Sequence, residues 1–502
     1  MRSKTVISLL FGIIGGSYVL LHDIFIIFFI DAYVNGFGIT IQSFLIGEFI
    51  FLIWNSLNDL IFGFYIDAYI LKNSKSSSKI ITKRLSIIRY SSLLFSIIFS
   101  LMWKNIYLSD YPGIRFGLNL CIYDTFLTLI NQQHDALLND LSSDQIIRMK
   151  LGQSTSFFQA ISAFGVIFVS WKSHQPHVKI GSNQNLSEDF TYQVDVLSLF
   201  CGLISVISSS ILIKFYSHNR IDTLSTTPQT HEGGKAIFKY FSSLFNLKNM
   251  FWLVLTQIFQ IFNCHFNSNF FPIIAQSLLS EEWHEYIFLI LGVSFILPHI
   301  NNYFLLKISE KFGIYSVIRY LFLIKVLIAL FTFLFGYNSS FIIIFFILSN
   351  RIFTEGVCKI FSQVITYLVD EDYITNLRQA PIPTIVLGTT SFFSKPGQTL
   401  APIVGILSIS SLMGKNFCPD GDCSKAIFDV MTDKFQVSAD SPKDTLKRAC
   451  FLTSTILTII AGSLQLLFWN KFTLHGDYLK RLQAQCQKRL TSSPTMSKFN
   501  LV

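Results

Sequence analysis

The feature that most constrains this chain is a succession of about twelve apolar segments, each long enough to cross a bilayer as a helix. Hydrophobic residues make up 51% of the 502 residues, and charged residues only 14%. A soluble fold does not bury this much apolar surface in such long segments, whereas lipid solvates it. We therefore predict an all-α polytopic membrane protein whose main surrounding is the lipid bilayer. The segments lie near residues 6–33, 41–66, 86–106, 113–138, 153–171, 194–215, 249–275, 286–306, 315–336, 341–368, 382–410 and 449–470.

A long polar connection over residues 216–247 divides these segments into two sets of six. Two bundles of six helices around a site near the membrane midplane are a common plan among transporters. The chain is therefore predicted to consist of four parts. They are a first bundle over residues 1–215, a cytoplasmic linker over 216–247, a second bundle over 248–470 and a basic cytoplasmic tail over 471–502.

Basic residues cluster at four places that share one side of the membrane if the chain crosses it twelve times. Cytoplasmic loops carry an excess of Lys and Arg, so this count places both termini in the cytoplasm. The net charge of +9 fits this arrangement, and no basic–aromatic pattern indicates nucleic-acid binding. We expect the protein to be a monomer that is located in the plasma membrane. The basic residues are Arg2, Lys4, Lys72, Lys75, Lys79, Lys83, Arg84, Lys307, Lys311, Arg319, Lys471, Lys480, Arg481, Lys488 and Arg489.

Two loops carry signs of an extracellular location. Asn185-Leu-Ser is a glycosylation sequon in the predicted outer loop 172–193, so we expect a glycan on Asn185. Asn338-Ser-Ser is also a sequon, but it lies too close to the bilayer to be modified. Cys418 and Cys423 flank a polar turn, and they are expected to form a disulfide if that loop is extracellular. Two cysteines alone do not make a metal site.

The second apolar segment contains a cluster of polar residues. Asn55, Asn58 and Asp59 stand at i, i+3 and i+4, so they share one helical face. A carboxylate at membrane depth costs roughly 2.5–3.5 kcal/mol on insertion scales, so it needs a cation, a proton, water or a polar partner. Asn and Asp oxygens are also the ligands that hard cations prefer. The cluster is therefore either a coupling-ion or proton site, or a polar patch that packs helices together.

Two further charges lie at membrane depth. Asp23 lies in the first segment, and Lys395 lies in the eleventh segment, directly before Pro396, where a proline must loosen the helix. Because Lys395 has no partner on its own helix, its natural partners are Asp59 or Asp23 from the other half of the chain. A lone cation of this kind favours a functional role.

The tenth segment carries charges of alternating sign. Arg351, Glu355 and Lys359 stand at i, i+4 and i+8, so they lie on one face. They either pair with one another and hold the bundle together, or they contact a substrate. Membrane-embedded charges must face the protein interior, so we expect Arg351 and Glu355 to line a central cavity with Asp23, Asp59 and Lys395. At the end of this segment, the acidic run 370–372 is interpreted as a solvated turn.

Several motifs resemble one superfamily of transporters. Gly63-Phe-Tyr-Ile-Asp67 resembles the Gly-x3-Asp signature of the major facilitator superfamily. Trp54-Asn-Ser-Leu-Asn-Asp resembles the helix-two motif of its glycoside–pentoside–hexuronide cation symporter branch. Longer stretches spread over nearly the whole chain are similar to major facilitator superfamily domain-containing proteins. They are Tyr123-Asp-Thr-Phe-Leu-Thr-Leu, Cys264-His-Phe-Asn-Ser-Asn-Phe-Phe-Pro272, Pro298-His-Ile-Asn-Asn302, Ser349-Asn-Arg-Ile-Phe-Thr-Glu-Gly356, Leu368-Val-Asp-Glu-Asp372, Lys395-Pro-Gly-Gln-Thr399 and Phe472-Thr-Leu-His-Gly476.

The resemblance implies the major facilitator fold, with a cation site on helices two and four and solute contacts on helices one, four and five. Asn58 and Asp59 match the cation motif, while Asn55 replaces its first acid. On an alignment through the loop after helix four, Thr128 matches a cation ligand, Asn131 replaces an acid and Ser156 replaces an arginine. The candidate cation ligands are Asn55, Asn58, Asp59 and Thr128, and the candidate substrate residues are Asp23, Asn131, Lys395, Arg351 and Glu355.

These residues favour a transport function. The expected activity is symport of a small organic solute, such as a sugar or a lysolipid, coupled to Na⁺ or H⁺. The alternative is a protein of the same fold that no longer transports and acts as a surface or scaffold partner, because Asn55 and Ser156 replace charged groups. No nucleophile–base set or metal cluster is evident in the sequence, so we expect neither an enzyme nor a cofactor.

Overall fold

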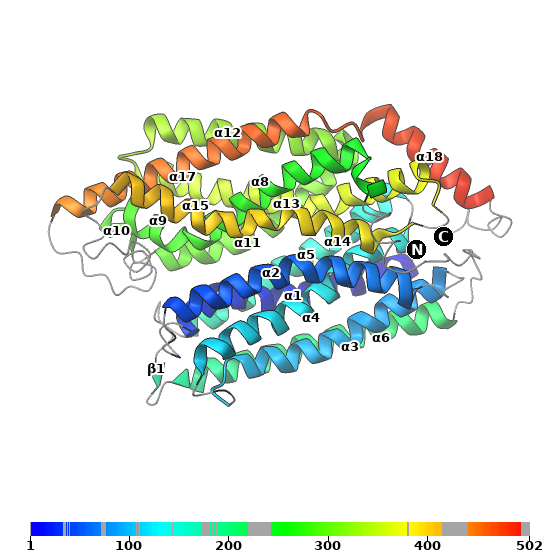
Figure 1. The fold of residues 1–502 in the computed structure, drawn as a ribbon, viewed down its shortest axis with the longest axis horizontal. Helices are drawn as coiled ribbons and strands as arrows, with labels where there is room; N and C mark the ends of the chain where they lie inside the picture. The colour runs from blue at the N-terminus through cyan, green and yellow to red at the C-terminus, as the bar shows by residue number, and fades with distance from the viewer. Residues whose placement is uncertain are drawn as a thin grey trace.

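The computed structural model describes most of the chain as helices arranged in two bundles (Figure 1). Each bundle comes from one half of the sequence, and the helices run roughly side by side. The two chain ends lie at the same end of the molecule, as an even number of crossings requires. The described residues are 2–33, 37, 39, 41–71, 77–106, 108, 111–142, 144–172, 180–181, 185–186, 188–218, 242–284, 286–378, 381–413 and 440–492.

The first bundle contains six long helices and a short hairpin. In the hairpin, β1 (Ile180–Gly181) pairs antiparallel with β2 (Asn185–Leu186), at the end of the molecule away from the termini. The helices are α1 (Arg2–Asp31), α2 (Ile41–Tyr65) with its π-helical continuation η2 (Ile66–Ile70), α3 (Ser77–Met102), α4 (Pro112–Leu141), α5 (Gln145–Lys172) and α6 (Glu188–His218).

The second bundle repeats this plan with two interrupted helices. The helices are α8 (Lys248–Asn269), α9 (Phe271–Leu278), α10 (Glu281–His284), α11 (Ile287–Phe312), α12 (Ile314–Phe335), α13 (Ser340–Thr375), α14 (Pro383–Ser394), α15 (Pro396–Met413) and α17 (Asp440–Trp469), followed by the polar α18 (Gly476–Ser492).

The described helices account for all twelve predicted segments. The seventh segment is divided into α8 and α9, and the eleventh into α14 and α15, with Pro272 and Pro396 in the first turns of α9 and α15. Proline donates no backbone hydrogen bond, so an interruption at these points is expected. Within the described residues, seven helices are long and apolar enough to cross a membrane, judged by length and composition alone.

Several helices extend beyond their predicted limits. Helix α3 begins at Ser77 instead of residue 86, and α13 continues to Thr375 instead of ending at 368. The predicted limits follow the apolar stretch, whereas these helices continue as polar turns that the periodicity of apolar residues does not reveal. Most of the predicted linker lies outside the described residues, as do Cys418 and Cys423. The predicted domain limits and the disulfide therefore stay predictions.

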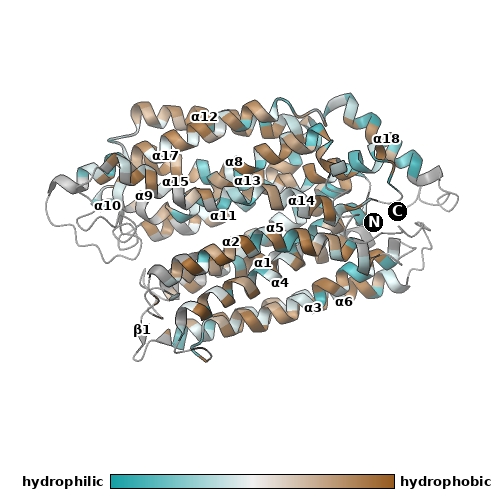
Figure 2. Ribbon diagram, in the orientation of Figure 1, coloured by the Kyte–Doolittle hydropathy of each residue, from teal (hydrophilic) through white to brown (hydrophobic). Residues whose placement is uncertain are grey.

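The outer surface has the character expected of a protein in lipid. Large apolar side chains such as Phe49, Phe200 and Leu334 are exposed along the helices. Figure 2 shows hydrophobic residues along the lengths of the bundles and hydrophilic residues gathered on α18. A soluble monomer rarely exposes apolar surface on this scale. The bilayer therefore solvates the long sides of the molecule.

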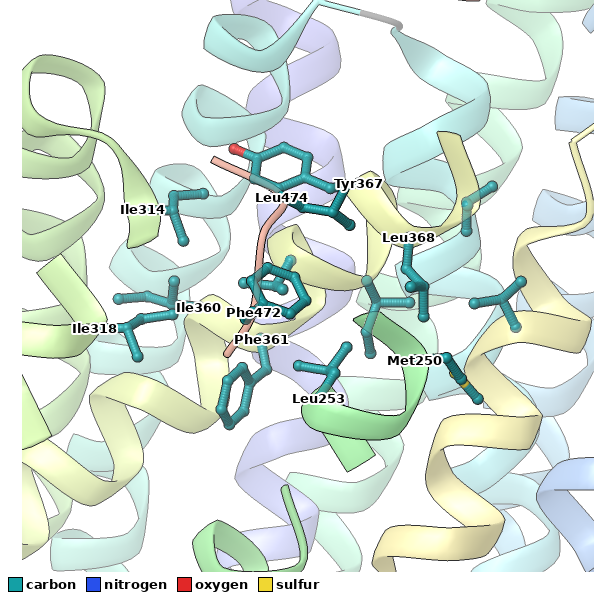
Figure 3. Close-up of a cluster of buried hydrophobic side chains, with 14 of the residues drawn as sticks. Met250, Leu253, Ile314, Ile318, Ile360, Phe361, Tyr367, Leu368, Phe472 and Leu474 are labelled. Atoms are coloured by element: carbon teal, nitrogen blue, oxygen red, sulfur yellow. The ribbon is translucent and has the colours of Figure 1, made fainter. Parts of the chain in front are cut away.

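The core of the second bundle includes residues from its own C-terminal connection. Phe472 and Leu474, which lie between α17 and α18, are buried beside Phe361 and Leu253 (Figure 3). Trp469 stacks on Phe472 with ring centroids 4.7 Å apart. These contacts hold the start of α18 against the end of the bundle that carries the termini.

The two bundles meet through α14 and α11. Helix α14 packs against α2 and α4 of the first bundle as well as α8 and α13 of its own, while α11 packs against α5. Glycine makes the α2–α14 contact possible. A Cβ atom on Gly388 would lie 2.4 Å from the Asp59 carbonyl oxygen, and one on Gly63 would lie 2.5 Å from the Thr384 carbonyl oxygen. The absence of a side chain thus lets the backbones approach closely.

Candidate cation site between the two bundles

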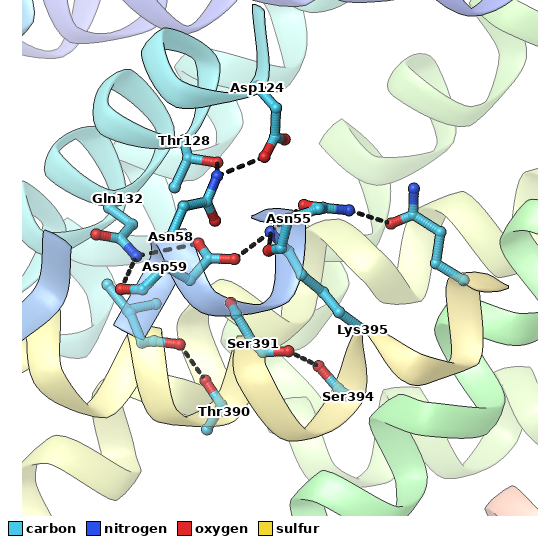
Figure 4. Close-up of polar contacts among 12 residues, drawn as sticks. Asn55, Asn58, Asp59, Asp124, Thr128, Gln132, Thr390, Ser391, Ser394 and Lys395 are labelled. Carbon is cyan, nitrogen blue, oxygen red and sulfur yellow. Dashed lines mark hydrogen bonds and ion pairs between the residues drawn. The ribbon is translucent and has the colours of Figure 1, made fainter. Parts of the chain in front are cut away.

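Lys395 occupies the centre of the contact between α2 and helix eleven. Its ammonium group forms an ion pair with the Asp59 carboxylate and donates hydrogen bonds to two oxygens of Asn55 (Figure 4). The distance to the Asn55 backbone oxygen is 2.6 Å. The side chains of Lys395 and Asp59 are 17% and 7% exposed, respectively. A cation from one half of the chain therefore neutralises a carboxylate from the other.

The local backbone explains why Lys395 reaches this position. Helix α14 ends at Ser394 and α15 begins at Pro396, so Lys395 lies where the helix is interrupted. Because Gly388 allows α14 to lie directly against α2, the lysine side chain can reach Asn55. In the first turn of α15, the side-chain oxygen of Gln398 accepts a hydrogen bond of 3.1 Å from the Asn55 amide.

Helix α4 forms the other wall of the site. Asp124, Thr128 and Gln132 stand at i, i+4 and i+8, so they share one helical face. The Asn58 amide donates to Asp124 and lies 3.4 Å from the Thr128 hydroxyl, and the Gln132 amide donates to the Asp59 carboxylate at 3.0 Å. The sequence reasoning missed Asp124 and Gln132. Their spacing with Thr128 is the signal that could have revealed them.

Two amide oxygens in this cluster, Asn58 Oδ1 and Gln132 Oε1, are buried without a hydrogen-bond donor among the described residues. The Asp59 Oδ2 atom beside them pairs with the Lys395 ammonium. Buried acceptors in folded proteins nearly always have a donor or an ordered water, so such a group needs an explanation. Carboxylate, amide and hydroxyl oxygens close together are the ligands of hard monovalent and divalent cations. The arrangement can therefore hold a positive charge, and the Lys395 ammonium beside Asp59 is one.

Two predicted substrate residues flank this cluster on the first bundle. Asp23 is buried on α1. Its neighbour His22 forms a hydrogen bond of 2.7 Å between Nδ1 and the hydroxyl of Tyr123, which directly precedes Asp124. Helix α1 is thus connected to the α4 wall. Asn131 is partly exposed on α4 and does not take part in the Asp59 network, in which its neighbour Gln132 does.

The helix-ten residues Arg351 and Glu355 lie within the second bundle, outside the Lys395 network. The guanidinium of Arg351 donates to the Ser294 carbonyl at 3.2 Å and the Ser268 hydroxyl at 3.0 Å. Glu355 accepts a hydrogen bond of 3.0 Å from the Cys264 thiol. Arg351 therefore turns towards neutral groups of α11 and α8 and not along its own helix towards Glu355. The Lys359 side chain lies outside the described residues.

A second polar cluster joins the bundles nearer the termini. The Asp67 carboxylate accepts hydrogen bonds from the backbone N–H groups of Thr384 (3.0 Å) and Ile385 (3.1 Å), in the first turn of α14. Arg84 pairs with Asp67 at 3.0 Å and with Asp140 at 2.5 Å. A carboxylate at a helix N-terminus is stabilised by the helix dipole as well as by these bonds. The Gly-x3-Asp signature thus connects α2 to α14.

The acidic run at the end of α13 is not the solvated turn that the sequence predicted. Asp370 and Asp372 are buried, and they pair with Arg148 (3.1 Å) and Arg378 (3.0 Å). The prediction was wrong because the end of α13 is covered by α18 and contacts the first bundle. Sequence alone does not place Arg148, which is 222 residues from Asp370, beside it.

Comparison with known proteins identifies relatives of the chain. No family model matches it. It is 32% identical to transmembrane protein 180 of Gallus gallus over 500 residues, which is 96% of this chain and 95% of the relative. It is 30% identical to transmembrane protein 180 of Mus musculus over 506 residues, with the same coverage.

Solved structures share the fold at much lower identity. A bacterial homologue of the iron transporter ferroportin in an outward-facing state has 13% identity and a TM-score of 0.58, and covers 94% of this chain and 100% of its own. The major facilitator superfamily transporter FucP in the outward conformation has 14% identity and a TM-score of 0.55, and covers 92% and 99%. These likenesses confirm the predicted all-helical fold of about twelve spans.

The similarity to transmembrane protein 180 extends over nearly the whole chain, as the long motifs in both halves predicted. The chain is thus a multi-pass integral membrane protein with the major facilitator fold, and it belongs to the transmembrane protein 180 family.

Proposed function

We propose that this protein is a symporter that couples Na⁺ or H⁺ to the movement of a small organic solute, such as a sugar or a lysolipid. The cation would bind among Asn55, Asn58, Asp59 and Thr128. The observation that supports this most directly is the group of buried acceptor oxygens without donors beside a single ammonium group. Such a cluster is stable only if a positive charge or a proton occupies it.

The position of Lys395 supplies a coupling mechanism. An incoming cation or proton at Asp59 competes with the Lys395 ammonium for the same carboxylate. Its binding releases the lysine, and a contact between the two bundles is lost. A ligand shifts a conformational equilibrium only through such differential contacts. Cation binding would then change the relative stability of the arrangements of the two bundles.

The solute would bind next to this site. Asp23 and Asn131 lie on the first bundle, and Lys395, once released from Asp59, becomes a cation that a solute can contact. Arg351 and Glu355 are proposed as solute contacts from the second bundle. We further propose that both termini are cytoplasmic, that the protein is a monomer and that it resides in the plasma membrane.

Reconstituted vesicles test the proposal. The full-length protein is screened for uptake of sugars and lysolipids with a Na⁺ gradient, a pH gradient or neither. Uptake of at least one solute should depend on one gradient, and Asp59→Asn should abolish that dependence. Asp195→Asn is the matched control, because Asp195 forms a half-exposed ion pair with Lys104 far from the site. Gradient dependence that survives in Asp59→Asn would show that the cation binds elsewhere.

One observation favours the alternative of a protein that no longer transports. The single carboxylate of the helix-two motif is already neutralised by Lys395, and Asn55 takes the place of a second acid. If this internal pair is permanent, neither Na⁺ nor pH changes the site. The thermal unfolding midpoint of the purified protein would then be the same in Na⁺ and in choline at equal ionic strength, and no solute would be taken up.

A further inference from the structure

Arg351 is a buried cation with no acidic partner among the described residues. Arg351 lies in the membrane-spanning part of α13 and is 6% exposed. Its guanidinium contacts only neutral groups among the described residues, namely the Ser294 carbonyl, the Ser268 hydroxyl and the Phe295 ring, 4.3 Å away. Arginine stays protonated in proteins and carries five N–H donors. An uncompensated charge at this depth is costly, so a counter-charge is expected.

A small cavity lies against this guanidinium. Besides Arg351, its polar lining consists of Asn267, Asn350 and Ser454, and the rest is apolar. Its volume of about 20 Å³ is enough for one water-sized species. The Asn267 amide lies 3.5 Å from its nearest acceptor, Asn263 Oδ1, which is too long for a strong hydrogen bond. The Asn350 amide and the Ser454 hydroxyl already donate to other groups. The cavity thus combines a fixed positive charge with the weakly bonded Asn267 amide, and no carboxylate is among its lining residues.

We propose that this cavity binds a small inorganic anion of the halide class, with chloride as the physiological candidate. The anion would neutralise Arg351 and accept a hydrogen bond from the Asn267 amide. Chloride is close to water in size, and it tolerates apolar walls better than a strongly hydrated anion does. The site is separate from the Lys395 network, so the proposal does not depend on cation-coupled transport.

The second bundle also supplies a matched comparison. Lys325 is 2% exposed on α12, and its ammonium donates to Gln465 at 2.6 Å. It is likewise a buried cation, but it does not line the cavity around Arg351. If chloride stabilised buried cations in general, substituting either Arg351 or Lys325 would reduce its effect. If chloride occupies the cavity, only substituting Arg351 should reduce the effect.

The test measures thermal unfolding of the purified full-length protein in detergent while sodium chloride replaces sodium gluconate. Sodium concentration and ionic strength stay constant, so the cation site is unaffected. A ligand that binds only the folded state raises the unfolding midpoint in a saturable way. The wild-type midpoint should therefore rise with chloride and also with bromide. Arg351→Gln should abolish this rise, whereas Lys325→Gln should keep it.

Ser454→Val keeps the test decisive if Arg351→Gln does not fold. Valine replaces a polar wall by a larger apolar one and places a methyl group in the cavity. The chloride dissociation constant should therefore increase about tenfold or more. An unfolding midpoint of the wild type that is equal in chloride and gluconate would overturn the proposal. So would an unchanged chloride dissociation constant in Ser454→Val.

Discussion

Asp59 and Lys395 form a buried pair whose members come from the two halves of the chain. Removing one partner of such a pair leaves a buried, unpaired charge and typically lowers the free energy of unfolding by about 3–5 kcal/mol. Removing both partners leaves no unpaired charge. The stability of this protein should therefore depend on the pair as a unit. An exposed ion pair contributes about 1 kcal/mol or less, because water and salt screen it.

A double-mutant cycle tests this dependence. Asp59→Asn and Lys395→Met should each lower the thermal unfolding midpoint, and the double variant should recover a large part of the loss. The same cycle on the half-exposed pair of Lys104 and Asp195 should give small, nearly additive changes. Additive losses at Asp59 and Lys395 would show that the two residues do not interact.

The sequence revealed part of this site and not the rest. Asn55, Asn58 and Asp59 were recognisable because a helix at membrane depth tolerates few polar groups. Lys395 was recognisable as a lone cation that needs an acid from the other half. Asp124 was missed although it shares the spacing of Thr128 and Gln132, because α4 carries polar residues on more than one face and the sequence does not tell which face meets α2.

Helix α14 shows how a short element positions the site. Its first turn is held by the Asp67 carboxylate, and its middle lies against α2 because Gly388 has no side chain. Its end presents Lys395 to Asn55 and Asp59. Any change that separates α14 from α2 should therefore weaken the site without altering a polar residue.

Gly388→Ala tests the closeness of α14 and α2. The new Cβ atom would lie 2.4 Å from the Asp59 carbonyl oxygen, so the two backbones must separate. Overpacking of this kind costs about 1–3 kcal/mol, and the unfolding midpoint should fall. Gly117→Ala on α4 is the control, because its Cβ would lie 3.5 Å from the Gly47 Cα atom, an ordinary contact. Equal midpoints in the two variants would contradict the close approach.

Helix α18 offers a second test at this scale. Cys486 is buried between α18 and the end of α13, and burial raises the pKa of its thiol to about 12. Only the thiolate reacts with alkylating reagents, so Cys486 should react slowly with maleimide near neutral pH. Arg489 holds α18 in place by donating to the carbonyls of Tyr373 and Arg378.

Arg489→Ala should therefore accelerate alkylation of Cys486, as measured by mass spectrometry of the modified peptide. Arg481→Ala removes an exposed arginine from the same helix and should leave the rate unchanged. Rapid modification of the unchanged protein would mean that α18 does not stay docked.

The architecture of the whole molecule follows from the bilayer more directly than the site does. Only helices satisfy the backbone in lipid, so each long apolar segment predicts one span. Twelve spans in two sets predict two bundles, and this fold is confirmed. The ends of helices such as α3 and α13 were not predictable, because polar turns outside the lipid carry no apolar period.

The orientation of the molecule is open to a glycosylation test. Asn185 lies on β2, at the end of the molecule away from both termini. If the termini are cytoplasmic, Asn185 is extracellular and should carry a glycan in a eukaryotic membrane. Asn185→Gln should then migrate like the glycosidase-treated protein, while Asn338→Gln should migrate like the wild type. No difference between Asn185→Gln and the untreated wild type would count against this orientation.

The interruption of helix eleven gives its two parts different neighbours. Helix α14 packs most extensively against α2 and also contacts α4, α8 and α13, whereas α15 packs on α8 and α17. If the bundles swing against each other, the bend is therefore expected at Lys395, and the rigid units are not the two halves of the sequence. Spin labels on α14 and α2 should keep a constant separation through a transport cycle, while the separation between labels on α14 and α15 should change.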